Sequence, residues 1–372
     1  MSDETPIRPG PPADEPLDGG ESPRLSGWQP RGAAVTPSAR STPPYRPYVG
    51  RLQRTPASAV AGDVVLSADV ATSDMSVSSS ARLGGRAIAL AGLVVVGGVV
   101  LSRLIGWVRT AVFLAEFGGS NPNLDAFYAA FRIPDTLFQL VAAGAVGSAL
   151  VPVASALLAD GEEERARRLI STVGNLMVLA LLPLAVVIWI AAPTIVPVIL
   201  PTDPLHPELL ELEVFLTRVM LLSPILLAVG AVMTAALNAL GIFGAPAIAP
   251  NVYNIAIVIC AVALTPFLGV SALAIGVVVG AAGHVLTQAP AIRRARIWTP
   301  QIHLNDPAVR ETFKLMGPRA LGLGATQIVF LVTTFFAASL HDDGAQSAYF
   351  STFTALQIPV GLIGVPLGIV LL

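Results

Sequence analysis

The sequence predicts an all-α polytopic membrane protein, and three observations support this fold class. Only 12% of the 372 residues are charged and 54% are hydrophobic, whereas a soluble domain has about 25% charged residues. The mean hydropathy is +0.72. After residue 86 the apolar residues form long continuous runs, each near the roughly 20 residues that cross a bilayer as a helix. These runs are too continuous for the alternating strands of a β-barrel, and too numerous for the core of a soluble protein of this size.

The first 85 residues follow a different pattern. They are rich in Pro, Ser, Gly, Asp and Arg, as in segments 9–12 and 41–44. Such a segment buries too little apolar area to offset its ordering entropy, so we expect a disordered tail at 1–85. The tail would be a plain solvated extension or, as the alternative, a partner-binding segment. The tail lacks the early apolar run that is typical of a signal peptide. The first helix should therefore act as the insertion signal and stay in the membrane.

About eight apolar segments follow the tail, each long enough to cross a bilayer as a helix. Several are longer than one crossing requires, so they should tilt or extend beyond the membrane. The last reaches Leu372 without the polar flank that normally closes a membrane helix, which predicts a fragment or a truncated gene product. The segments lie at residues 87–115, 124–157, 169–200, 209–239, 246–268, 271–292, 312–340 and 346–372.

The loops between these segments predict the orientation of the chain, because short loops rich in Arg and Lys stay cytoplasmic. Loops 118–123, 201–208 and 341–344 contain no Lys or Arg. Basic residues occur before the first segment, between the second and third, and between the sixth and seventh, namely Arg82, Arg86, Arg165, Arg167, Arg168, Arg293, Arg294, Arg296, Arg310 and Lys314. All the basic loops share one parity, so we expect the N-terminus to be cytoplasmic.

The first segment contains Arg103 and Arg109, although an Arg at the centre of a span costs about 2.5–3.5 kcal/mol to insert. The two arginines are six residues apart, so they lie about 120° apart around a helix and can both line only a wide cavity. Gly106 between them permits close packing or a bend. An Arg-lined cavity suits an anionic substrate, because guanidinium groups bind phosphate bidentately, and it does not suit a cationic drug.

The second segment carries four polar side chains at helical spacing. Asp125, Arg132, Asp135 and Gln139 follow one another at intervals of seven, three and four residues, which places them on one stripe of a helix. Pro134 should distort this stripe locally. The stripe predicts a polar wall that faces a cavity or a partner helix.

Three further ionisable groups lie in later segments. Arg218 is in the fourth, His284 in the sixth, and Arg319 in the seventh, directly after Pro318. Arg109, Arg218 and Arg319 are close enough to segment ends that their side chains could reach the lipid headgroups instead of a cavity. For His284, a packing function is favoured over metal ligation.

No pattern typical of an enzyme or a metal site occurs in the sequence. There is no Walker loop or HExxH motif, and the four histidines lack metal-ligand spacing. A single cysteine, Cys260, cannot form an internal disulfide, and a net charge of −2 gives no support for binding of nucleic acid. We therefore predict a non-enzymatic protein without a cofactor, a metal or a nucleic-acid partner.

Short motifs then carry a family resemblance along residues 87–372. They are SRLIGWVR at 102–109, DAF at 125–127, FRIPD at 131–135, GA at 144–145, VP at 151–152, ALN at 236–238, APAIAP at 245–250, MGPR at 316–319 and IPVGLIG at 358–364. In this order they resemble the motifs of the MurJ/MviN family, whose members flip the lipid-linked peptidoglycan precursor lipid II by alternating access. Each motif alone is weak, but the ordered set is specific.

The resemblance implies the multidrug/oligosaccharidyl-lipid/polysaccharide exporter fold, which usually has 14 helices in two lobes. The chain would then contain a disordered cytoplasmic tail, a first lobe of six helices at 86–300, and the start of a truncated second lobe, helices seven and eight, at 301–372.

The resemblance also implies functions for the membrane charges. Arg103, Arg109 and Arg132 would meet the pyrophosphate of an undecaprenyl-linked substrate. Asp125 and Asp135 would orient arginines or couple transport to an ion. The full set of candidate substrate-binding residues is Arg103, Arg109, Asp125, Arg132, Asp135, Gln139 and Arg319.

The chain departs from the family pattern in the second and eighth helices. Where the family carries further cavity arginines, this chain has Phe138-Gln139 and Thr354, and Gln357 stands at a usual acidic position. A less positive cavity keeps two alternatives open beside a lipid II flippase, namely an exporter of another lipid-linked oligosaccharide and a non-transporting membrane scaffold. Each of these would lie among the lipids of a bacterial inner membrane.

Overall fold

A computed structural model describes residues 85–140, 145–200, 207–340 and 342–359, and all regular secondary structure within them is helical. The predicted all-α class is therefore confirmed. The tail predicted for residues 1–85 lies outside this range except for Gly85, which begins the first helix, and so does the end of the last predicted segment.

Ten helices follow one another in the described residues. They are α3 (Gly85–Phe117), α4 (Pro122–Phe138), α5 (Ala145–Ala159), α6 (Glu163–Ile199), α7 (Glu208–Met220), α8 (Leu222–Ala239), α9 (Gly244–Leu268), α10 (Ser271–Ala295), α11 (Pro307–Ser339) and α12 (Ala345–Pro359).

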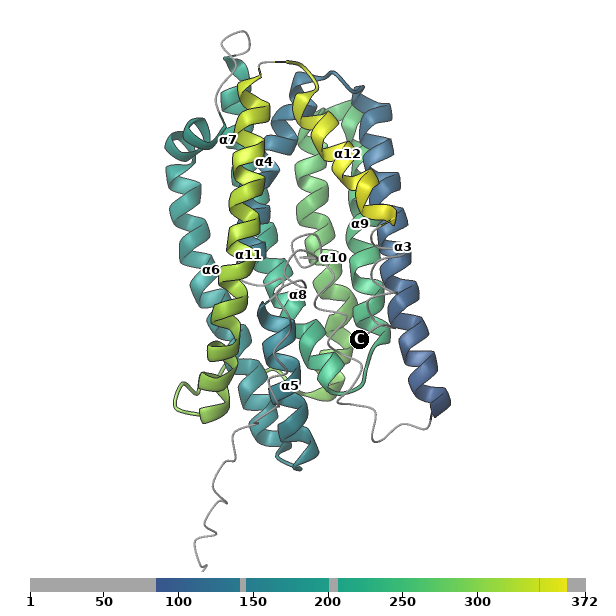
Figure 1. Cartoon of the computed structure of the whole chain (residues 1–372), viewed down its shortest axis with the longest axis vertical. Coiled ribbons are helices and arrows are strands. Elements are labelled where there is room, and N and C mark those ends of the chain that lie inside the picture. The colour runs from purple at the N-terminus through teal and green to yellow at the C-terminus, as the bar shows by residue number, and fades with distance from the viewer. Residues whose placement is uncertain (1–84, 141–144, 201–206, 341, 360–372) are drawn as a thin grey trace, which may run out of the picture. The chain divides into compact units, whose positions relative to one another are not determined.

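Two predicted segments are each divided into two helices. Segment 124–157 corresponds to α4 and α5, which Figure 1 shows at opposite ends of the bundle. Segment 209–239 corresponds to α7 and α8, which meet at Leu221. Six helical stretches within the described residues are long and apolar enough to cross a membrane, namely 92–117, 163–199, 208–239, 244–268, 271–295 and 307–339.

Side-chain caps explain where the helices α4 and α11 begin. The Asn121 side chain accepts hydrogen bonds from the N–H groups of Asn123 and Leu124, with Pro122 at the first position of α4. The Asp306 side chain accepts from the N–H of Ala308 at 2.9 Å, again just before a proline. Proline suits this position because its missing N–H would have no helical partner there.

Glycines let α3 and α10 approach α9 closely. At Gly98 of α3, an added Cβ would lie 2.7 Å from the carbonyl oxygen of Ala247 in α9. At Gly280 of α10, an added Cβ would lie 2.6 Å from the carbonyl oxygen of Tyr253, also in α9. A larger residue at either position would force the helix backbones apart.

The side chains on the outside of the bundle are largely apolar. Ile190, Phe267, Leu321 and Phe336 are each more than 60% exposed. Exposed apolar surface on this scale would be unfavourable in water, but it matches the hydrocarbon of a bilayer.

The segment between α10 and α11 is docked onto the start of α6. The Ser171 hydroxyl donates to the Ile297 carbonyl oxygen at 2.9 Å and accepts from the Thr299 N–H at 3.0 Å. The Trp298 ring lies against Gly174, where an added Cβ would be 2.3 Å from the ring. These contacts hold the segment that leads into α11 against α6.

An ion pair completes this docking. Arg165 of α6 contacts Asp306 through two nitrogens, with Nη2 3.0 Å from Oδ1 and Nε 3.3 Å from Oδ2. Partial burial alone would raise the pKa of the Asp306 carboxyl, but the hydrogen bonds from Arg165 and from the Ala308 N–H hold this pKa below its ordinary value.

Candidate functional site

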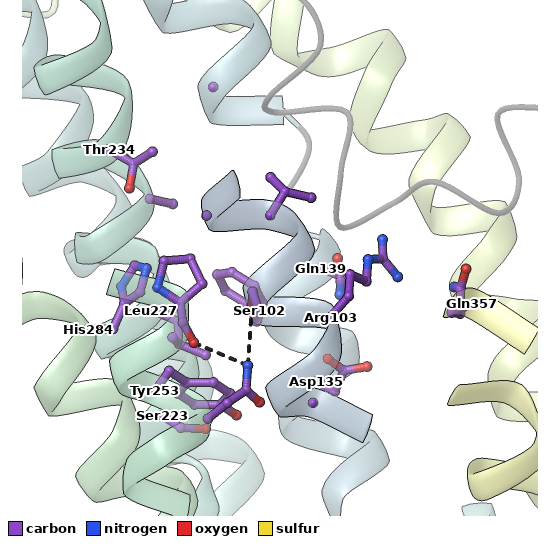
Figure 2. A pocket seen from close by; sticks show the side chains of 18 of the residues that line it. Ser102, Arg103, Asp135, Gln139, Ser223, Leu227, Thr234, Tyr253, His284 and Gln357 are labelled. Atoms are coloured by element: carbon purple, nitrogen blue, oxygen red, sulfur yellow. Dashed lines mark hydrogen bonds between the residues drawn. The ribbon is translucent and has the colours of Figure 1, made fainter. Parts of the chain in front are cut away.

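A cavity of about 540 Å³ lies between α3, α4, α8 and α9 on one side and α11 and α12 on the other. A close view shows part of its lining (Figure 2). α12 packs against α3 and α4, while α11 packs against α5 and α6. The cavity is therefore bordered by helices from early and late parts of the described chain.

One wall of the cavity is the face of α3 that carries Arg103 and Arg109. Nη1 of Arg109 donates to Oδ1 of Asn254 in α9 at 3.0 Å. The Asn254 amide nitrogen in turn donates to the Pro250 carbonyl oxygen at 3.1 Å and to the Ser102 hydroxyl at 3.4 Å. Asn254 thus orients Arg109, while Nε of Arg109 is buried without a hydrogen-bond partner among the described residues.

A second wall is the stripe of α4 predicted from spacing. Arg132, Asp135 and Gln139 all line the cavity. Nη1 of Arg132 lies 3.2 Å from Oδ2 of Asp135, and the Arg132 side chain is only 5% exposed. Its guanidinium lies over the rings of Phe350 and Phe330, 4.4 and 4.9 Å from their centroids. Arg132 therefore joins α4 to α11 and α12 as well as bordering the cavity.

A third wall is polar but uncharged. Thr234 and Asn238 of α8 and His284 of α10 line the cavity. In Figure 2, Thr234 and His284 lie on the opposite side of the view from Arg103. Asn238, Thr234 and Asn254 are site residues that no sequence pattern indicated, because single uncharged polar residues in an apolar run carry no spacing signal.

Two predicted site residues lie outside the cavity lining. Asp125 accepts hydrogen bonds from the backbone N–H groups of Gly344, Gln346 and Ser347, at 2.8, 3.3 and 2.9 Å, so it caps the start of α12. Arg319 is an exposed residue of α11. The structure does not bring either side chain into the cavity with the other candidates.

Arg218 is also placed away from the cavity. Its Nε donates to the carbonyl oxygen of Trp189 in α6 at 3.0 Å, and its guanidinium lies over the Trp189 ring, 4.8 Å from the centroid. This arginine has a structural partner in its own part of the bundle.

The positions that depart from the family pattern do face the cavity. Gln139, Thr354 and Gln357 all belong to its lining. The ionic side chains of the described lining are therefore three arginines and one aspartate, which leaves a net positive cavity. Within the residues that the structure describes, no group of three or more His, Cys, Asp or Glu is placed to hold a metal ion.

This arrangement can bind an anion but offers no evident covalent chemistry. Guanidinium groups line a cavity whose other lining side chains, apart from Asp135, are apolar or uncharged, and guanidinium N–H groups bind phosphate oxygens through charge-assisted hydrogen bonds. The cavity is also bordered by helices with exposed apolar outer faces, which suits a ligand that has an anionic head and a lipid tail.

Comparison with known proteins identifies similar chains. The family described as "Lipid II flippase MurJ" matches residues 114–372. The lipid II flippase MurJ of Burkholderia cenocepacia is 31% identical over 290 residues, which are 75% of this chain and 55% of that protein. The probable lipid II flippase MurJ of Rhizobium meliloti is 33% identical over 287 residues, 74% of this chain and 53% of that protein. The chain thus spans about half the length of these relatives.

One solved structure has the same fold. It is described as lipid II flippase MurJ in an inward closed conformation, with a TM-score of 0.57 and 23% identity, and the match covers 70% of this chain and 54% of that chain. This likeness confirms the exporter-like helix bundle that the sequence predicts.

Proposed function

The chain belongs to the MurJ family of lipid II flippases, and on that premise we propose that it moves a lipid-linked peptidoglycan precursor across the membrane by alternating access. It is a multi-pass membrane protein. A flippase moves its substrate without changing covalent bonds, so the cavity needs groups that bind and release rather than groups that catalyse.

The observation that carries this proposal is the pair of arginines on α3. Arg103 and Arg109 line a cavity that lies between two groups of helices. Nε of Arg109 is buried and has no partner among the described residues, so it is a donor that awaits an acceptor. The diphosphate of a lipid-linked precursor supplies only acceptor oxygens and a negative charge, which matches this requirement.

Arg132 takes part in a different way under this proposal. Its pairing with Asp135 and its position between two aromatic rings hold it against the helices on the other side of the cavity. Asp135 therefore orients Arg132, and Arg132 adds positive charge to the cavity from the α4 side.

The location and orientation are part of the proposal. Arginines at the start of α6 and in the last turn of α10 support a cytoplasmic position for these two helix termini. This position supports a cytoplasmic N-terminus in a bacterial inner membrane.

A second candidate is export of another lipid-linked oligosaccharide. Gln139, Thr354 and Gln357 line the cavity as uncharged side chains. A cavity with fewer charges has a weaker preference for diphosphate and leaves more of the recognition to the glycan, which favours this candidate if lipid II is not transported.

Complementation tests the proposal directly. We would express the gene for this chain in cells depleted of their own lipid II flippase and measure growth and lipid II exposure on the outer face of the membrane. We expect rescue by the unchanged protein, and a loss of at least about tenfold in flipping for Arg103→Ala, equivalent to about 1.4 kcal/mol.

Arg218→Ala is the matched control, because Arg218 is a membrane arginine outside the cavity lining. It should retain flipping at comparable protein levels in the membrane. Failure of the unchanged protein to rescue, with the protein present in the membrane, would reject lipid II as substrate. Full flipping by Arg103→Ala would reject its binding of the diphosphate.

A further inference from the structure

We propose that the wall formed by Asn238 and His284 is a separate subsite that binds the uncharged sugar groups of the substrate. This inference rests on the proposed function, because it assumes a substrate with both a diphosphate and a glycan. It assigns the two kinds of group to different walls of one cavity.

The subsite is built on two helices that pack closely. Gly230, Thr234 and Asn238 recur every four residues on α8, and His284 and Gln288 are four residues apart on α10, so each set lies on one helix face. An added Cβ at Gly230 would lie 2.2 Å from Nδ1 of His284. Glycine at this position therefore lets the imidazole lie directly against α8.

Hydrogen bonds of Gln288 join α8 and α10 without Asn238 or the His284 side chain. The Gln288 amide nitrogen donates to the Gly230 carbonyl oxygen at 3.2 Å and to the His284 carbonyl oxygen at 3.3 Å. The Gln288 carbonyl oxygen accepts from the Thr234 hydroxyl at 2.9 Å. None of these hydrogen bonds uses the polar atoms of the Asn238 or His284 side chains.

One polar atom of each side chain has no partner among the described residues. Oδ1 of Asn238 and Nδ1 of His284 are both buried without a hydrogen bond, although both residues line the cavity. A buried polar atom left without a partner is unfavourable, so such an atom at a cavity wall indicates a ligand or water that completes it.

The chemistry of Oδ1 of Asn238 favours a sugar over a phosphate. An amide oxygen accepts hydrogen bonds and does not donate them, so its partner must be a donor. Phosphate oxygens of a diphosphate are acceptors, whereas the hydroxyl and amide groups of a glycan donate. The guanidinium groups on the α3 wall have the opposite requirement.

The two walls are also apart in space. Figure 2 shows Thr234 and His284 on one side of the view and Arg103, Asp135 and Gln139 on the other. One substrate whose diphosphate meets the arginines would thus place its attached sugars toward α8 and α10.

A pair of probes separates the two subsites. We would titrate the purified full-length protein in detergent with lipid II and with undecaprenyl pyrophosphate, which has the same lipid and diphosphate but no glycan. The variants are Asn238→Leu and His284→Phe, singly and together, so that one poorly folding variant does not decide the result. Thr287→Val on α10 is the matched control, because its hydroxyl donates to the Gly283 carbonyl oxygen of its own helix and it does not line the cavity.

We expect the double variant to bind lipid II about tenfold more weakly while its Kd for undecaprenyl pyrophosphate stays within about twofold. The control should leave both constants unchanged. Lipid II binding that stays within about twofold in all three variants would overturn the subsite and leave only water or packing there. An equal loss for both probes would overturn it too, since the effect would not depend on the glycan. If the unchanged protein binds neither probe, the proposed function itself fails, and no variant is needed to see this.

Discussion

Arg132 lies in an apolar span, where a guanidinium without partners would be strongly destabilising. Its side chain is almost fully buried, but Asp135 pairs with it and two aromatic rings enclose it. Removing one member of such a pair leaves an uncompensated charge, whereas removing both leaves none. The stability of this region should therefore depend on whether the pair is complete.

A double-mutant cycle tests this dependence. We expect Asp135→Ala to lower the free energy of unfolding by about 1–3 kcal/mol, because it leaves the Arg132 cation buried without its partner. Adding Arg132→Met should recover much of this loss, since the unbranched apolar side chain fills much of the same space without a charge. Thermal unfolding of the purified variants in detergent measures both. A double variant no more stable than Asp135→Ala alone would contradict the pairing argument.

Spacing in the sequence predicts much of this residue-scale arrangement but not all of it. Arg132, Asp135 and Gln139 were expected on one helical stripe, and they do line one cavity together. Asp125 belongs to the same stripe, yet it meets the backbone of α12, more than 200 residues away along the chain. No local pattern in the sequence reports which distant helix start will lie beside a given carboxylate.

At the scale of elements, Asp125 connects α4 to α12. Three backbone N–H groups at the start of α12 donate to its carboxylate, and the Ser347 hydroxyl donates to the Gly119 carbonyl oxygen beside it. The first N–H groups of a helix have no partner within the helix, so a carboxylate from another element can satisfy them and also interacts favourably with the helix dipole.

This cap predicts local opening when it is removed. Asp125→Ala should raise amide hydrogen exchange at residues 344–347 by about five- to tenfold, as expected for loss of a cap worth about 1 kcal/mol. Exchange measured by mass spectrometry on peptides from this region tests it. Asn121→Ala is the matched control, because Asn121 caps α4 and should increase exchange at residues 123–124 instead. Unchanged exchange at 344–347 in Asp125→Ala would show that the cap does not hold the start of α12.

The breaks within spans are the part of the elements that composition does not reveal. Residues 209–239 form one apolar run, but the helix α7 ends at Met220 and α8 begins at Leu222. Apolar side chains on both sides of such an interruption contact the same lipid, so hydropathy is continuous although the helix is not.

At the scale of the whole molecule, lipid as a solvent explains why so much of the helical fold could be predicted. A backbone that crosses a bilayer must satisfy its hydrogen bonds internally, so each long apolar run was expected to be a helix. The positions of the polar groups of the cavity could not be predicted in the same way. Asn254 and Thr234 meet their partners, and Asn238 comes to line the cavity, only because particular helices pack side by side.

Basic residues at the turns predict the orientation of the molecule in the membrane. The ends of α5 and α6 that meet near Asp160 lie next to Arg165, Arg167 and Arg168, whereas the turn at Ser120 has no basic neighbour. After Cys260→Ala removes the only cysteine, we expect Asp160→Cys to react with a membrane-impermeant maleimide only in permeabilised spheroplasts, and Ser120→Cys to react in intact ones. Both residues are exposed in their turns, so a lack of reaction reports sidedness rather than burial. The reverse labelling would place the N-terminus outside, and the arginine cavity would then have to receive its substrate from the opposite side of the membrane.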